Sequence, residues 1–221
     1  MKLYILTLLL VLSSYKSTAL QIDTTFLLKN ESQSIFIDTS KKSRGYELLT
    51  RFKLDSNFFN KYSLSIKKNN GVNNQLKKIS LDSSLPKRWV KIVLYKNKFY
   101  AYSPCDYLYD YRFTITDSCF VDYTDLLSPE QILNYGKINS SKYFFQITQI
   151  VGTKKVFFHI INKQKGIAIV EQIIKGKRSF CLIIDIEKIR EIPIIVNHCI
   201  ERADEYEFSE PDYKKLLKKV K

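Results

Sequence analysis

Strand-length apolar segments recur at regular intervals along the second half of this sequence, and this spacing restricts the fold more than any other feature. Short turns rich in glycine, asparagine and lysine separate the segments, which are residues 143–150, 155–160, 167–173, 179–185 and 192–197. Strands repeated every 8–12 residues or so are typical of antiparallel barrels and sandwiches. We therefore expect an all-β, antiparallel fold. The hairpin-by-hairpin order favours a lipocalin-like up-and-down barrel, with a two-sheet β-sandwich as the alternative.

The strongest alternation of side chains lies in residues 106–115, which are part of the aromatic-rich stretch 89–123. There Tyr107, Tyr109 and Tyr111 fall on one face of the expected strand, because alternate side chains of a strand point to opposite sides. A row of aromatic rings could line a ligand cavity, and we name these tyrosines and Trp89, the only tryptophan, as candidate ligand-binding residues. The structural alternative is that tyrosines simply cover a half-buried sheet surface.

The first half of the chain reads as further strands and turns. Asn97 suits the positive-φ position of a tight turn. Residues 46–54 fit either a strand or a helix, and Thr50, Phe52 and Leu54 favour the strand. The expected strands are 24–28, 34–38, 46–54, 62–67, 76–81, 91–95, 99–102 and 119–123.

Two short helices interrupt this pattern. Ser128 followed by Pro129 and Glu130 resembles a capped helix start, and predicts a helix over residues 129–134. A second helix is expected near residues 210–220, where Ser209 can act as the N-cap and apolar residues fall on one face.

Residues 1–19 have the features of a secretory signal peptide. Lys2 precedes an apolar run over residues 3–12, and small residues occupy positions 17–19. The run is too short to span a bilayer, which takes about 20 residues. We therefore expect an exported protein, secreted or periplasmic, with one all-β domain over residues 20–221 and no transmembrane span.

The formal net charge of the chain is +14. A net charge this positive can favour binding to nucleic acid or other anionic partners. The lysines are scattered, however, and arginine, the better phosphate ligand, is scarce. Abundant Lys, Asn, Ile, Tyr and Phe are what AT-rich codons produce, so the composition argues against nucleic-acid binding.

The four cysteines are even in number, as expected for disulfides in an exported chain. A hairpin centred near Arg190 would place Cys181 opposite Cys199, which leaves Cys105 to pair with Cys119. The alternative is that all four are buried thiols. The sequence contains no CxxC repeat and no histidine ligand pattern, so we expect no metal site.

Known catalytic signatures are also missing from the sequence, and we expect no catalytic residues and no cofactor. The sequence therefore favours an exported, non-enzymatic binding or interaction domain for a small hydrophobic ligand, a glycan or a protein partner. The alternative is a secreted hydrolase whose residues meet only in three dimensions. An apolar pocket with few titratable groups would favour the binder, and paired carboxylates or a carboxylate–histidine pair in a cleft would favour the hydrolase.

Overall fold

The structure is a computed structural model that describes residues 24–51, 78–106, 112–123, 129–148, 152–200 and 203–218. Several predictions lie outside these residues. They are the signal peptide 1–19, the strand 62–67, and the candidate ligand-binding residues Tyr107, Tyr109 and Tyr111.

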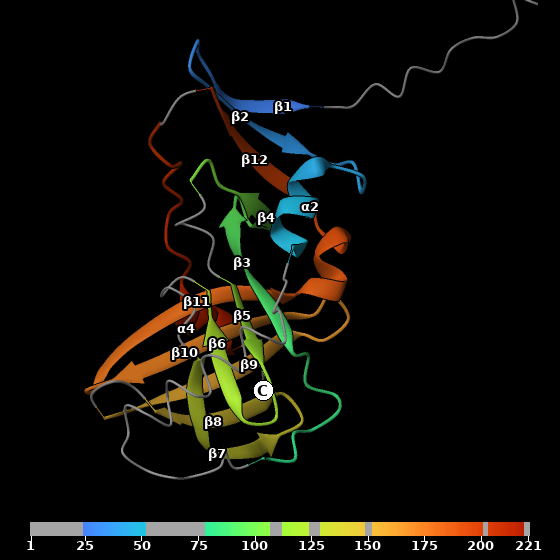
Figure 1. The fold of residues 1–221 in the computed structure, drawn as a ribbon. Helices are drawn as coiled ribbons and strands as arrows, with labels where there is room; N and C mark the ends of the chain where they lie inside the picture. The colour runs from blue at the N-terminus through green and yellow to red at the C-terminus, as the bar shows by residue number, and fades with distance from the viewer. Residues whose placement is uncertain are drawn as a thin grey trace, which may run out of the picture.

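Eight antiparallel strands form a closed barrel, which confirms the predicted fold class. Seven of them follow one another as hairpins, and β3 closes the barrel by pairing with both β11 and β5 (Figure 1). The barrel strands are β3 (Arg88–Tyr95), β5 (Arg112–Ile115), β6 (Cys119–Asp122), β7 (Pro129–Asn139), β8 (Lys142–Thr148), β9 (Thr153–Asn162), β10 (Ile167–Ile174) and β11 (Lys177–Asp185).

Side chains fill the interior of the barrel. The largest are fully buried aromatic residues, namely Trp89, Phe113, Phe120, Phe145 and Phe158. Trp89 stacks on Phe113 at 6.4 Å between ring centroids and lies 5.7 Å from the ring of Phe158. An eight-stranded barrel is just wide enough for such packing. The interior is therefore a hydrophobic core and differs in this respect from the ligand cavity of a lipocalin.

A second, smaller sheet extends from the barrel in the order β1-β2-β12-β4-β3 (Figure 1). Its strands are β1 (Thr25–Lys29), β2 (Gln33–Asp38), β4 (Lys98–Ser103) and β12 (Ile194–Cys199). β3 is long enough to belong to both sheets. The β12–β4 pair is parallel, and every other pair in the described sheet is antiparallel. The β3–β4 hairpin turns at Lys96 and Asn97, both with positive φ, as predicted for Asn97.

Residues 44–50 form a helix, so the strand predicted over 46–54 is wrong there. In α2 (Arg44–Thr50) the Ser43 side chain accepts from the Gly45 N–H, and the buried Tyr46 hydroxyl donates to the Ile192 carbonyl at 2.5 Å. A Cβ on Gly45 would lie 2.8 Å from Ile194 Cδ1, so the missing side chain lets the helix pack closely on β12. Tertiary packing of Tyr46 and Leu49 outweighs the strand propensity of the sequence.

The helix predicted over residues 129–134 is also wrong, because this segment begins β7. Pro129 is tolerated as the first residue of a strand, where its missing N–H costs little. Ile132 packs into the barrel core, and Glu130 forms an ion pair of 2.5 Å with the buried Lys154. These long-range contacts outweigh the local capping pattern. Residues 78–81 likewise form no strand, contrary to the prediction for 76–81.

The predicted pairings Cys181–Cys199 and Cys105–Cys119 are both wrong. The structure instead joins Cys105 to Cys199, whose Cα atoms are 5.8 Å apart, and leaves Cys119 and Cys181 as free thiols. Between β11 and β12 the short helix η2 (Ile186–Glu191) carries the chain from the barrel to the second sheet. β11 and β12 therefore never pair, and Cys181 and Cys199 lie in different sheets.

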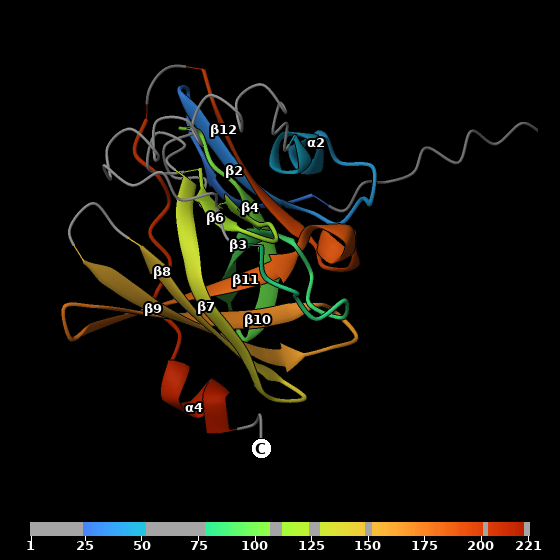
Figure 2. The same cartoon turned by 60° about the horizontal axis from the view of Figure 1, so that its bottom comes forward.

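The last described element is α4 (Tyr213–Lys218), which confirms a helix within the predicted range 210–220. Its apolar residues Tyr213, Leu216 and Leu217 pack against the outer side of the barrel, next to Phe180. The preceding residues 203–212 run along the molecule from the second sheet to the barrel (Figures 1 and 2). We call residues 203–212 the C-terminal segment.

Candidate functional site

A cleft among the described residues lies where β3 leaves the barrel. β3 pairs with β11 at three positions only, from Trp89↔Asp185 to Lys91↔Ile183. Beyond Lys91 it pairs with β4 and diverges from the first half of β11. The two strands thus open into a wedge, which the C-terminal segment borders on the third side.

The wedge encloses a cleft of about 460 Å³, which is within the range of small-ligand sites. Because side chains alternate along a strand, β3 and β11 each present two different faces to the cleft. Ile92 and Leu94 share the outer face with Phe180 and Tyr213, and this side is apolar. Lys91, Ser179 and Cys181 lie on the face of the barrel interior, so the same cleft has a polar side with a cation.

The C-terminal segment, which forms the third side of the cleft, is held in place by part-buried polar contacts around Glu205. Its carboxylate accepts from the Tyr102 hydroxyl, from Asn197 Nδ2 at 3.0 Å and from the Asp106 N–H at 2.6 Å. Burial, and then the hydrogen bond to Glu205, raise the pKa of Tyr102 well above its usual value, so Tyr102 stays a donor. Gln33 adds bonds to Asn197 Oδ1 and to the Asp204 carbonyl.

Two aromatic side chains of the C-terminal segment pack nearby. Phe208 meets Tyr102 edge-on at 5.0 Å between ring centroids, and Tyr206 lies 6.5 Å from Tyr95. The disulfide of Cys199 lies two residues beyond Asn197 on β12. The wall that faces β3 and β11 is therefore an anchored part of the fold.

The free thiol of Cys181 lines the cleft but is unsuited to nucleophilic chemistry. Burial raises its pKa to about 12, and the nearby charge of Lys91 lowers the pKa only in part. Its sulfhydryl lies 3.4 Å from the Leu182 carbonyl. A catalytic cysteine needs a depressed pKa to form thiolate, so Cys181 acts here as a small apolar side chain.

A histidine and a carboxylate do meet within hydrogen-bond reach, on the outer face of β9 and β10. His159 Nε2 lies 3.0 Å from Glu171 Oε2, and Arg178 lies 3.2 Å from the other carboxylate oxygen. Burial lowers the pKa of His159, although the hydrogen bond to Glu171 raises it in part. Neither His159 nor Glu171 lines the cleft, so the pair does not form the hydrolase site described above.

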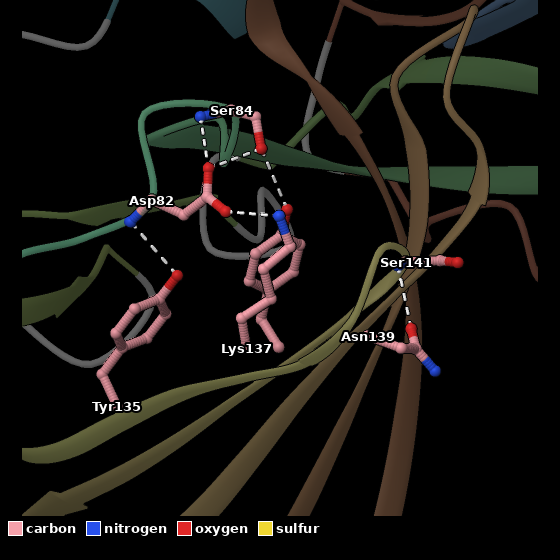
Figure 3. A network of polar contacts seen from close by, with 7 residues as sticks. Asp82, Ser84, Tyr135, Lys137, Asn139 and Ser141 are labelled. Atoms are coloured by element: carbon pink, nitrogen blue, oxygen red, sulfur yellow. Dashed lines mark hydrogen bonds and ion pairs between the residues drawn. The ribbon is translucent and has the colours of Figure 1, made fainter.

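A polar network secures the segment before β3 to the barrel (Figure 3). Asp82 accepts from Lys137 Nζ at 2.6 Å and from Ser84 Oγ at 2.6 Å, while its N–H donates to the Tyr135 hydroxyl. The Ser84 hydroxyl also meets the Tyr143 hydroxyl at 3.1 Å. Hydrogen bonds from Lys137 and Ser84 hold the pKa of Asp82 well below its usual value. The residues of this network satisfy one another's hydrogen-bonding groups, so the network holds the segment 78–87 on the barrel.

Of the candidate ligand-binding residues the structure describes only Trp89, which does not line the cleft. Trp89 has no exposed surface, and its Nε1 donates to the Pro86 carbonyl at 2.8 Å, so in this structure it belongs to the barrel core. The side chains that do line the cleft were missed, because single strands of ordinary composition supply them. One signal lay in the tail, where Glu205, Tyr206, Glu207 and Phe208 alternate acidic and aromatic residues.

The described part of the chain contains no group of three or more His, Cys, Asp or Glu side chains that could hold a metal ion. No helix within it has the length and apolar character needed to cross a bilayer. The Cys105–Cys199 disulfide is compatible with an extracellular or periplasmic protein.

Comparisons with protein-family models, with curated proteins and with solved structures found no significant match. We therefore infer function from the geometry of the cleft.

Proposed function

We propose that this chain is an exported, non-enzymatic binding protein that recognises its partner at the cleft between β3, β11 and the C-terminal segment. The observation that carries the proposal is a cleft of about 460 Å³ that combines an apolar side with Lys91 on a polar side. Its charged lining residues are Lys91, Glu205 and Glu210, and the carboxylate of Glu205 is already bound by three protein donors.

Two features support export. Residues 1–19 have the pattern of a signal peptide, and disulfides such as Cys105–Cys199 persist mainly in oxidising compartments. In the described residues the one close histidine–carboxylate pair, His159 with Glu171, lies away from the cleft. No specific observation therefore favours the hydrolase alternative over the binder.

The test is native mass spectrometry of the protein exported by its own host, before and after gentle activation. Ser179→Trp places a large side chain in the cleft, and Lys177→Trp is its control on the same face of β11, two residues nearer the hairpin. We expect extra mass on the wild type and on Lys177→Trp that is released on activation, and its loss from Ser179→Trp. Extra mass that survives in Ser179→Trp would place the ligand elsewhere and contradict the proposal.

A further inference from the structure

Backbone groups of β11 point into the cleft without a partner in the described part of the chain. The Asp185 N–H donates to Gly166 on the β10 side at 2.9 Å, whereas the Leu182 N–H points to the opposite side, toward the Tyr213 hydroxyl. Residues alternate in direction along an antiparallel strand. Phe180 therefore directs its N–H and C=O groups into the cleft, and Arg178 directs its own to the same side, at the open end of the wedge; no described backbone group meets either residue there.

On the other side of the wedge, β3 also has backbone groups that meet no partner among the described residues. Ala101 of β4 lies opposite Ile92, yet the Ala101 N–H donates away from β3, to the Pro193 carbonyl at 3.0 Å. Ala101 and Ile92 thus form a non-hydrogen-bonded pair, in which both residues direct their backbone groups outward. Ile92, and by alternation Leu94, present N–H and C=O groups to the cleft. Two unpaired strand edges therefore face one another across the wedge.

We propose that this wedge accepts an extended peptide segment of a partner protein, as an added strand between β3 and β11. The proposal rests on the binding function assigned to the cleft and names its ligand class. An unpaired strand edge is a template for a further strand, whose main-chain hydrogen bonds supply affinity. The open part of the β11 edge, from Arg178 to Cys181, is four residues long, or about 13 Å at the rise of a strand.

The two sides of the cleft specify the side-chain pattern of the peptide. Its apolar residues would face Ile92, Leu94 and Phe180, and the alternate residues would face Lys91. Two carboxylates also line the cleft, but Glu205 already accepts from three protein donors and Glu210 interacts with Tyr213 on the apolar side. Acidic residues therefore suit Lys91 and the net charge of +14. The wedge therefore fits an extended peptide that alternates apolar and acidic residues. Residues 205–208 of this chain, which border the same cleft, have this alternation themselves.

The first experiment measures fluorescence anisotropy of a labelled seven-residue peptide that alternates glutamate and isoleucine. A second peptide has the same side chains but N-methylated isoleucine amides, which removes the donors of one edge. A third replaces glutamate with lysine. We expect the acidic peptide to bind the wild-type protein at least about tenfold more tightly than either control, since each lost main-chain hydrogen bond weakens binding several-fold. Equal binding of the N-methylated peptide would overturn the proposal.

The second experiment removes one cleft-facing donor from the protein. Arg178→Pro deletes the N–H that points into the cleft and leaves the ladder to β10 intact, since proline is accepted where a strand N–H faces outward. Arg178→Ala is the matched control, because it removes the same side chain but keeps the N–H. We expect Arg178→Pro to bind the acidic peptide about fivefold more weakly than Arg178→Ala, provided both melt cooperatively. Equal affinities of the two variants would contradict strand addition on β11.

The outcomes separate this inference from the proposed function. If the wild-type protein binds none of the three peptides, the peptide assignment is wrong. In that case release of another ligand from the wild type, and its loss from Ser179→Trp, would still support a binding cleft.

Discussion

Removal of the Cys105–Cys199 disulfide tests the connection between the second sheet and the loop after β4. The perturbation is the double variant Cys105→Ala/Cys199→Ala, which breaks the link without leaving an unpaired thiol. The two cysteines are 94 residues apart in sequence. For a loop of that length, the chain-entropy relation gives a stabilisation of about 4.7 kcal/mol, and measured values often fall nearer 2 kcal/mol.

The assay is urea unfolding at neutral pH, with the free energy of unfolding extrapolated to water. We expect the double variant to lose between about 2 and 4.7 kcal/mol relative to the oxidised wild type. Wild-type protein unfolded under reducing conditions is the internal control and should match the double variant closely. A loss well below 1 kcal/mol would contradict the reasoning, because the link would then constrain the unfolded chain very little.

Peptide mapping without reduction tests the pairing itself. A cross-linked pair that contains Cys105 and Cys199, with one thiol titrating at Cys119 and one at Cys181 after unfolding, is the expected result. A cross-link between Cys181 and Cys199 would refute the topology, since it would require β11 and β12 to lie side by side.

Three further predictions follow from the described contacts. Trp89→Ala should lower the free energy of unfolding by about 3–5 kcal/mol in urea titrations, because it empties a fully buried site in the barrel; a smaller loss would indicate an open interior. Burial lowers the pKa of His159 below its usual value near 6.5, so the unfolded chain binds more protons below that pH and stability falls as the pH drops; His159→Gln should flatten this fall below about pH 6.5, and an unchanged profile would exclude His159 as its source. Asn30-Glu31-Ser32 and Asn139-Ser140-Ser141 match the Asn-X-Ser acceptor pattern, and both asparagines are exposed, so they should carry glycans in a eukaryotic secretory host; Asn30→Gln and Asn139→Gln should each remove one glycan mass, and unmodified wild type from that host would contradict the prediction.

Particular elements show why some sequence predictions were correct. The strands of the second half were confirmed because their period and their turns are local properties. The β10–β11 hairpin, for example, turns at Lys175 and Gly176, both with positive φ. The C-terminal helix was likewise predicted from its own amphipathic pattern. By contrast, residues 129–134 carry a helix-start pattern, and only pairing with β6 and β8 makes them a strand.

The sequence by itself determined that this chain folds as an antiparallel all-β domain with hairpins in order, because alternation and turn chemistry act within about ten residues. Tertiary structure decided everything that depends on how strands meet. β3 splits between two sheets, η2 separates β11 from β12, and the C-terminal segment borders the resulting wedge. The disulfide and the cleft both follow from these arrangements. Their residues are far apart in the chain, so no local pattern could bring them together.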